Sequence, residues 1–233
     1  MGIRARGIII AIDGPSGAGK STVARLLAER LGYVQIDTGA MYRAAALLIE
    51  QSGIDPADRG ALENFCQGLD IRLENNEGRQ TVIANGVNVT NQIRTPEISR
   101  LTSRISALKP VRDALMVSQR RMGSEGGVVL EGRDIGTVVF PDAELKFYLI
   151  ASAEERGRRR FEELAANGEK VTLQETIDEV VRRDIQDSER DIAPLCKATD
   201  AVLVDSSSIT VENVLYMMED IFRAKINKTG TAL

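Results

Sequence analysis

Residues 8–31 read IIIAIDGPSGAGKSTVARLLAERL, and this stretch decides the fold. The apolar run at 8–12 is rich in branched residues, which is typical of a strand buried on both faces of a sheet. The stretch at 21–31 carries apolar residues at helical spacing. Between them, GPSGAGKS at 14–21 matches the pattern G-x-x-x-x-G-K-[ST]. A strand, a glycine-rich loop and a helix in this order predict a phosphate-binding loop in an α/β protein.

The chemistry of phosphate binding explains this loop. Glycines 14, 17 and 19 let the backbone curl so that successive N–H groups point into one concavity. The N-terminus of the following helix adds partial positive charge. A lysine can then reach the β- and γ-phosphates, and a serine hydroxyl can hold Mg²⁺. The predicted nucleoside triphosphate site consists of Gly14, Pro15, Ser16, Gly17, Ala18, Gly19, Lys20, Ser21 and Thr22, with Ser21 as the metal-binding residue.

The rest of the chain alternates between short apolar runs and helical stretches. Five runs fit buried strands, at 8–12, 33–37, 128–132, 145–151 and 201–205. Helical patterns lie at 21–31, 41–51, 96–122, 153–166, 173–185 and 210–225. This order predicts a five-stranded parallel sheet flanked by helices, with right-handed crossovers. Residues 69–90 differ, because they alternate between polar and apolar residues and carry turn signals at 75–78 and 85–86, which predicts a small antiparallel insert.

Composition excludes several classes of protein. The 233 residues contain no histidine, which excludes a Ser-His-Asp triad, a Cys-His pair and a histidine-ligated zinc. A net charge of -4 argues against nucleic-acid polymers and anionic membranes as partners. The two cysteines form no disulfide framework, and the apolar run at 8–12 is too short for a signal segment or membrane span. We therefore expect a cytoplasmic protein.

Several classes of P-loop protein remain to be separated. The only Asn-Lys pair, at 227–228, lacks the aspartate of the guanine-reading N-K-x-D motif, which argues against a switch GTPase. No long apolar strand ends in paired acids, as a motor ATPase would require. A kinase for a small phosphorylated acceptor needs cationic side chains to hold two sets of phosphates. Polar residues suited to that task follow the predicted strands, at 37–43 and 131–134, and Arg183, Asp187 and Arg190 share one face of a predicted helix.

These residues lie in motifs that cover nearly the whole chain. They are IDGPSGAGKST at 12–22, DTGAMYR at 37–43, IRTPEIS at 93–99, GRDIGTVVFPDA at 132–143, EERGRRR at 154–160 and RDIQDSERDIAPL at 183–195. Together they closely resemble the bacterial cytidylate kinase family. The resemblance implies a P-loop nucleoside-monophosphate-kinase domain that uses ATP and Mg²⁺ to phosphorylate CMP or dCMP. It further implies a single domain over 1–233, with a core at 1–60, 96–152 and 172–233, an NMP-binding insert at 61–95 and a mobile lid at 153–171.

The resemblance also implies a role for individual residues. Cytosine would be read by Ser103, Arg112 and Asp134, which is chemically sensible because a carboxylate can accept from the cytosine amine. Catalysis would involve Lys20 with Arg133, Arg183 and Arg190. The remaining implied contacts are Thr38, Arg43, Arg133, Arg183, Asp187 and Arg190 to the acceptor, and Arg156 and Arg160 to ATP. Position 38 is Thr where some relatives have serine, and position 157 is Gly where the commoner family form has alanine.

Two alternatives stay open at this point. One is another P-loop kinase of similar size, acting on UMP, shikimate or dephospho-coenzyme A. The other is a regulator that binds nucleotide and signals through a partner protein, which would show slow turnover without dependence on an acceptor. For the kinase hypothesis we expect ATP and CMP or dCMP as small-molecule partners, a monomer, and no contact with nucleic-acid polymers or membranes.

Overall fold

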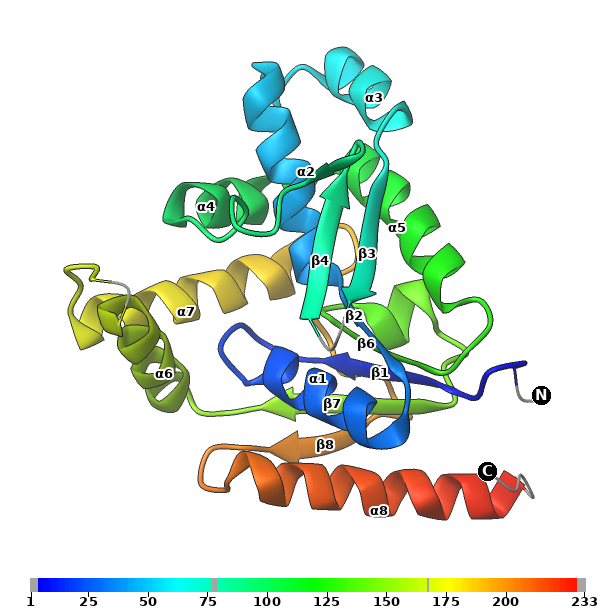
Figure 1. Ribbon diagram of the computed structural model, residues 1–233. Helices are drawn as coiled ribbons and strands as arrows, with labels where there is room; N and C mark the ends of the chain where they lie inside the picture. Colours follow the sequence, from blue (N-terminus) through cyan, green and yellow to red (C-terminus); the bar gives the residue numbers. More distant parts are fainter. Residues whose placement is uncertain (1–3, 77–78, 167, 230–233) are drawn as a thin grey trace. The chain divides into compact units, whose positions relative to one another are not determined.

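The computed structural model describes residues 4–76, 79–166 and 168–229 (Figure 1). Its contacts divide the chain into two compact units. The first comprises Met1–Gln35 and Gly126–Leu233, and the second comprises Ile36–Glu125. Within the described residues, no helix combines the length and the apolar character needed to cross a membrane.

A five-stranded sheet has the order β2-β6-β1-β7-β8 (Figure 1). Its strands are β1 (Ile9–Asp13), β2 (Val34–Asp37), β6 (Val128–Gly132), β7 (Leu145–Ile150) and β8 (Val202–Asp205). The central strand β1 pairs in parallel with both β6 and β7, and β7 pairs in parallel with β8. All five strands lie within one or two residues of their predicted positions. Because the strands are parallel, the loops that follow β1, β6 and β7 emerge at the same edge.

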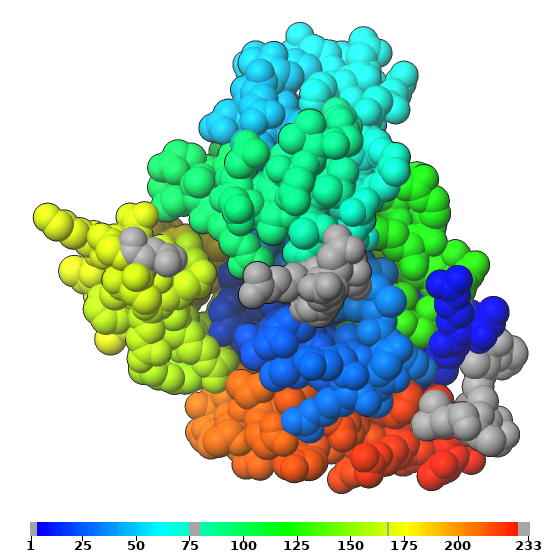
Figure 2. All heavy atoms as spheres, in the orientation of Figure 1, coloured from blue at the N-terminus to red at the C-terminus, as the bar shows by residue number. Residues whose placement is uncertain are grey.

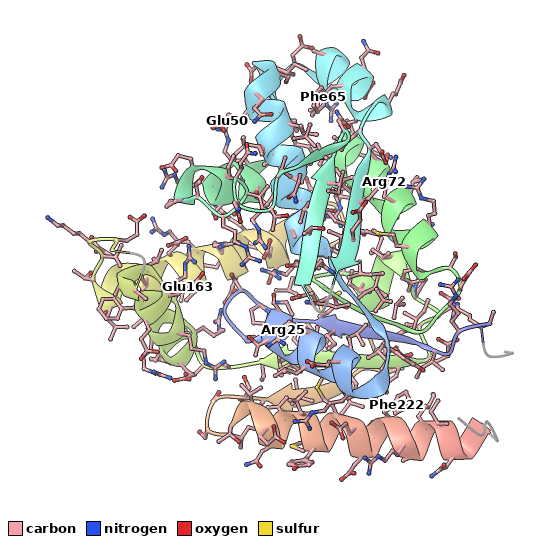
Figure 3. The ribbon with its side chains drawn as sticks, viewed as in Figure 1. Arg25, Glu50, Phe65, Arg72, Glu163 and Phe222 are labelled. Carbon is pink, nitrogen blue, oxygen red and sulfur yellow. The ribbon has the colours of Figure 1, made fainter. Side chains whose placement is uncertain are left out.

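The core of the first unit lies between this sheet and two helices, α1 (Lys20–Leu31) and α8 (Val211–Thr229). Alternate residues of β1, such as Ile10 and Ile12, pack with these helices. Phe222 of α8, labelled in Figure 3, meets the ring of Tyr33 edge to face with centroids 5.9 Å apart. Ile9, on the opposite face of β1, is also fully buried, so both faces of the strand are covered. The predicted fold class, a parallel sheet flanked by helices, is confirmed.

The second unit contains the predicted antiparallel sheet. Its strands β3 (Ile71–Asn76), β4 (Arg79–Ala84) and β5 (Val87–Asn88) lie in that order and pair in antiparallel fashion. Asn85 and Gly86 have φ values of 47° and 82°, as a tight hairpin turn requires at both central residues. The other predicted turn falls on residues 77–78, outside the described residues. The helices of this unit are α2 (Thr38–Ser52), α3 (Arg59–Gln67), α4 (Pro96–Ile105) and α5 (Lys109–Gly123).

The prediction of one helix over 96–122 is wrong, because the structure has two helices there. Helix α4 ends with its C-cap at Ser106, and α5 begins with Pro110 in its first turn. Proline has no N–H, and its ring would clash with the carbonyl four residues earlier, so a continuous helix could not pass this point. The break leaves the Ser106 carbonyl free to accept a hydrogen bond from Arg112 at 2.9 Å.

Helix α3 was not predicted from the sequence. Its N-cap Asp58 accepts a hydrogen bond from the Ala61 amide at 3.0 Å, and Gly68 ends it. Only Leu62 and Cys66, one turn apart, are buried. An aspartate cap, an i,i+4 apolar pair and a terminal glycine were signals in the sequence that could have identified this helix.

Helices α6 (Ala153–Ala166) and α7 (Leu173–Glu189) pack against each other in the first unit, where Figure 2 shows them in yellow-green and yellow. Gly157 of α6 lies against Ile177 of α7. A Cβ at this position would come within 2.3 Å of Ile177 Cγ1 and 2.9 Å of Ile177 Cα. The absence of a side chain at Gly157, where the commoner family form has alanine, therefore allows the backbones of α6 and α7 to approach each other closely. The lid at 153–171 and the insert at 61–95 stay predictions.

Candidate functional site

The loop between β1 and α1 has the backbone geometry that phosphate binding requires. Gly14, Gly17 and Gly19 have φ values of 146°, 78° and 90°. A Cβ at Gly14 would lie 2.0 Å from the Leu149 carbonyl oxygen, so any other residue would clash there. Helix α1 begins at Lys20, and among the described residues no side chain caps it. Its first N–H groups therefore remain suitable for an anion.

Lys20 lies within this loop and is only 6% exposed. Its Nζ donates a hydrogen bond to the Pro15 carbonyl oxygen at 2.6 Å. Burial, followed by the positive charge of Arg133, lowers the pKa of Lys20 well below its usual value. An anion placed beside the ammonium group would oppose both effects and favour the charged form.

Ser21, predicted to hold a metal ion, contacts a carboxylate that the sequence reasoning did not assign to the site. Its hydroxyl donates to Glu131 Oε2 at 2.6 Å, and Gln35 donates to Glu131 Oε1 at 2.9 Å. Glu131 is 4% exposed and lies on β6 in register with Ile12 of β1. An acidic residue near the carboxyl end of the predicted strand at 128–132 was the available signal.

These oxygen donors suit Mg²⁺, which prefers hydroxyl, carboxylate, phosphate and water oxygens. Within the described ranges, no group of three or more His, Cys, Asp or Glu side chains is placed to hold a metal ion. Beside a triphosphate, Mg²⁺ is usually bound through one or two protein oxygens plus phosphate oxygens and waters. The residues present therefore fit Mg²⁺ bound together with a nucleotide.

Asp13, at the end of β1, fixes the segment that follows β6. Its two carboxylate oxygens accept hydrogen bonds from the amides of Ile135 at 2.8 Å and Gly136 at 2.7 Å. These amides begin a single π-helical turn, η1 (Ile135–Val139), which was not predicted. Burial raises the pKa of Asp13 to about 6, although the two backbone hydrogen bonds act in the opposite direction. Asp13 thereby positions the residues just before η1, which include Arg133 and Asp134.

The first unit brings most of the predicted phosphate-binding arginines together. Arg133 Nε donates to Asp187 Oδ2 at 2.8 Å, and Arg190 lies 3.8 Å from Asp187 and 3.6 Å from Asp134. Burial and the charge of Arg133 lower the pKa of Arg183. Burial disfavours ionised Asp187, but the charge and hydrogen bond of Arg133 outweigh it and lower the pKa of that carboxyl.

One detail of the predicted cluster is corrected. Arg190 does not share a helix face with Arg183 and Asp187, because α7 ends at Glu189 and Arg190 has extended backbone angles of -66° and 140°. Its Nε instead donates to the Ala193 carbonyl oxygen in the following loop. The side chain still returns to the cluster and is 6% exposed.

Two arginines of α6 were predicted to contact ATP. Arg160 pairs with Glu163, labelled in Figure 3, at 2.9 Å on the surface of the helix. Arg156 is 5% exposed, and its guanidinium is bound to the Ala151 and Ser16 carbonyl oxygens and to Asp184. Direct contact of either residue with ATP stays a prediction.

The second unit carries the remaining predicted acceptor contacts. Thr38 is buried in the first turn of α2, and one turn later Arg43 lies 3.6 Å from Asp37. Arg112 of α5 is 6% exposed, and its guanidinium lies 5.7 Å from the ring centroid of Tyr42. Ser103 of α4 directs its hydroxyl to the Ser99 carbonyl oxygen at 3.4 Å. A buried hydroxyl, two guanidinium groups and an aromatic ring can supply contacts to a sugar, a phosphate and a base.

The fold and the first unit's site define the class of protein. A parallel sheet with a glycine-rich loop, a buried lysine and a cluster of arginines is typical of a P-loop phosphotransferase. A family model described as "Cytidylate kinase" matches residues 10–224. The chain belongs to the cytidylate kinase family.

Individual comparisons agree with this assignment. The chain is 58% identical over 224 residues to a cytidylate kinase of Citrifermentans bemidjiense, covering 96% of each chain. It is 59% identical over 217 residues to a cytidylate kinase of Geobacter sp. (strain M21), covering 93% of each. A crystal structure of an uncharacterized protein from Eubacterium ventriosum matches with a TM-score of 0.53 at 14% identity, covering 93% of this chain and 98% of that one. This last likeness concerns the fold alone.

Proposed function

We propose that this chain transfers the γ-phosphoryl group of ATP to CMP or dCMP, giving CDP or dCDP, with the residues of both units in the roles described below. Membership of the cytidylate kinase family supports the reaction. The observation that carries the assignment of roles is the cluster of cationic side chains beside the glycine-rich loop, in which Lys20 and the side chain of Arg190 are each 6% exposed.

The closeness of these cations can be followed in the pKa values. Burial contributes most to the lowered pKa values of Lys20 and Arg183, and the positive charge of Arg133 is the next cause for both, although nearby carboxylates act in the opposite direction. Asp187 pairs with Arg133 and lies 3.8 Å from Arg190, and Asp134 lies 3.6 Å from Arg190. Gathering several cations in a partly desolvated site is costly. The phosphates of a nucleotide and the spreading charge of phosphoryl transfer would offset this cost.

Mg²⁺ would be held by the Ser21 hydroxyl, which donates to Glu131 of β6, and Gln35 of β2 holds Glu131 in turn. When bound, the ion supplies positive charge to the β- and γ-phosphates. The Lys20 ammonium would leave the Pro15 carbonyl oxygen and bind phosphate oxygens of ATP in its place.

No general base is needed for the reaction. The attacking oxygen belongs to a phosphate monoester, which is already largely ionised at neutral pH. The work of the protein is therefore to position the two phosphates and to neutralise charge, which we assign to Lys20, Arg133, Arg183 and Arg190.

The acceptor would be recognised by separate groups for each of its parts. We assign the acceptor phosphate to Arg43 with the arginines of the first unit, and the pentose to Thr38 and Asp187. Cytosine would contact Ser103, Arg112 and Asp134. A carboxylate accepts from the cytosine amine but faces a carbonyl oxygen in uracil, so Asp134 would discriminate between the two bases.

Measuring ADP release from ATP across a panel of acceptors tests this function. CMP and dCMP should give the highest kcat/KM, with UMP, AMP, shikimate and dephospho-coenzyme A well below them. Preference for another acceptor would overturn the assignment, and ADP release that no acceptor accelerates would favour a nucleotide-binding regulator.

A further inference from the structure

Arg156 joins three parts of the first unit. It lies in the first turns of α6, and its Nε donates to the Ala151 carbonyl oxygen at 2.9 Å. One terminal nitrogen, Nη1, donates to the Ser16 carbonyl oxygen in the glycine-rich loop at 3.0 Å. The other, Nη2, pairs with Asp184 Oδ2 of α7 at 2.6 Å. The guanidinium therefore links the phosphate-binding loop to α6 and α7.

The contact with Ser16 has a consequence for the loop because the peptide bond is planar. In a trans peptide, the C=O of one residue and the N–H of the next point in opposite directions. Every peptide bond among the described residues is trans. Arg156 holds the Ser16 carbonyl on the side of α6, so the Gly17 N–H must point to the opposite side. In a glycine-rich phosphate loop, we expect that side to be the concavity in which phosphate oxygens bind.

The loop also packs directly on Arg156. A Cβ at Gly17 would come within 3.0 Å of Arg156 Cβ and 3.3 Å of its carbonyl oxygen. Arg156 therefore contacts one side of the Ser16–Gly17 peptide, through both van der Waals packing and a hydrogen bond.

Asp184 in turn holds Arg156. The Arg156 side chain is 6% exposed, so the loss of the Asp184 carboxylate at 2.6 Å would leave a buried charge poorly compensated. The second oxygen of this carboxylate, Oδ1, is buried and has no hydrogen-bond partner among the described residues. Arg156 is thus the group that accounts for the placement of Asp184.

We propose that Arg156 and Asp184 are positioning residues for the triphosphate: Asp184 orients Arg156, and Arg156 holds the Ser16–Gly17 peptide with its N–H directed into the phosphate cradle. This inference rests on the proposed function only in placing the phosphates of ATP on the glycine-rich loop. Neither side chain needs to touch the nucleotide.

The test compares phosphate affinity in Asp184→Ala, Asp184→Asn, Arg156→Lys and the Asp184→Ala/Arg156→Lys double variant. Isothermal titration calorimetry with tripolyphosphate and with ADP reports on the loop without any acceptor. We expect about a tenfold increase in Kd for Asp184→Ala and for Arg156→Lys, because each loses a charge-assisted hydrogen bond. Asp184→Asn, which keeps an acceptor oxygen, should show a smaller increase. The Kd of the double variant should exceed that of the weaker-binding single variant only slightly, because Asp184 acts through Arg156.

Arg158→Gln is the matched control, because Arg158 lies on the same helix but pairs with Glu155 and Glu162 at the surface. Its Kd should equal that of the wild type. All titrations are made at a temperature where circular dichroism shows each variant folded. The KM for CMP should change less than twofold in the Asp184 variants, in contrast to the KM for ATP.

Two results would overturn the proposal. If Arg156 contacted the phosphates directly, Asp184→Ala would free its guanidinium and leave the Kd for tripolyphosphate unchanged or lower. If the ion pair only stabilised the fold, the variants would lower Tm and leave every Kd at its wild-type value. The proposed function can fail independently, because a wild-type chain that does not phosphorylate CMP could still show the expected pattern with tripolyphosphate.

Discussion

Asp13 provides a test of the electrostatics of the site, through the pH dependence of folding. Its carboxyl group is 4% exposed, and burial raises its pKa from 3.8 to about 6. A carboxyl whose pKa is raised in the folded state stabilises the fold fully only below its unfolded pKa, and this contribution is lost as the pH rises through the folded pKa. The shift of about two pKa units corresponds to about 3 kcal/mol in total. About 2 kcal/mol of this falls between pH 4 and pH 7.

The perturbation is Asp13→Asn, which cannot ionise. The amide has one acceptor oxygen, so it keeps only one of the hydrogen bonds from Ile135 and Gly136. At pH 4 the wild-type carboxyl is itself protonated and likewise keeps one carbonyl acceptor, whereas the carboxylate accepts both hydrogen bonds at higher pH. We expect the unfolding free energy of the wild type, relative to that of Asp13→Asn, to fall by about 2 kcal/mol between pH 4 and pH 7.

Urea denaturation at unit steps of pH measures this difference. Far-ultraviolet circular dichroism is the suitable signal, since the chain has no tryptophan. Asp220→Asn, an exposed acid on α8, is the control and should differ from the wild type by a nearly constant amount. A constant difference for Asp13→Asn would refute the raised pKa. A difference that grows with pH would mean that the two backbone hydrogen bonds outweigh burial.

Three further predictions concern the reaction itself. Lys20→Ala should lower kcat by at least about 10³-fold with the fold intact by circular dichroism, because the lost charge acts on phosphates and not on the core; near wild-type turnover would remove Lys20 from the mechanism. Asp187→Ala should change the ratio of kcat/KM for CMP and dCMP, because only the ribose offers a 2′-hydroxyl to the carboxylate, and equal losses for both substrates would contradict that contact. Asp134→Asn should lower kcat/KM for CMP by about 10–100-fold while UMP gains relative to CMP, because an amide can donate to the uracil carbonyl. An unchanged ratio would mean that Asp134 serves only its ion pair with Arg190.

Features that depend on neighbouring residues were readable from the sequence. The glycine-rich loop is one, because the positive φ values at Gly14, Gly17 and Gly19 require glycine or nearly so. The turn at Asn85-Gly86 is another. Pro110 was also a local signal of a helix start. The prediction of one helix over 96–122 was wrong because it followed the helical periodicity and not the proline. The motifs that carry the family resemblance indicated phosphoryl transfer from ATP for the same reason, because each motif is a short run of adjacent residues.

Contacts between distant residues were decided only by the tertiary structure. Glu131 reaches Ser21, and Asp13 reaches the amide of Gly136, because β1 lies beside β6 in the sheet. Nothing in the local pattern of either strand states which strand will be its neighbour, since all five read as similar apolar runs.

The partners of the Arg156 side chain likewise could not be predicted from the sequence. Its motif indicated a cation near a triphosphate, but a guanidinium can donate to a phosphate, a carboxylate or a carbonyl oxygen equally well. Only the packing of α6 on α7, where Gly157 permits close approach, brings Asp184 and the Ser16 carbonyl within its reach. The sequence by itself determined the kind of chemistry, whereas the tertiary structure decided which partner each charged group meets, because that choice depends on distances across the fold.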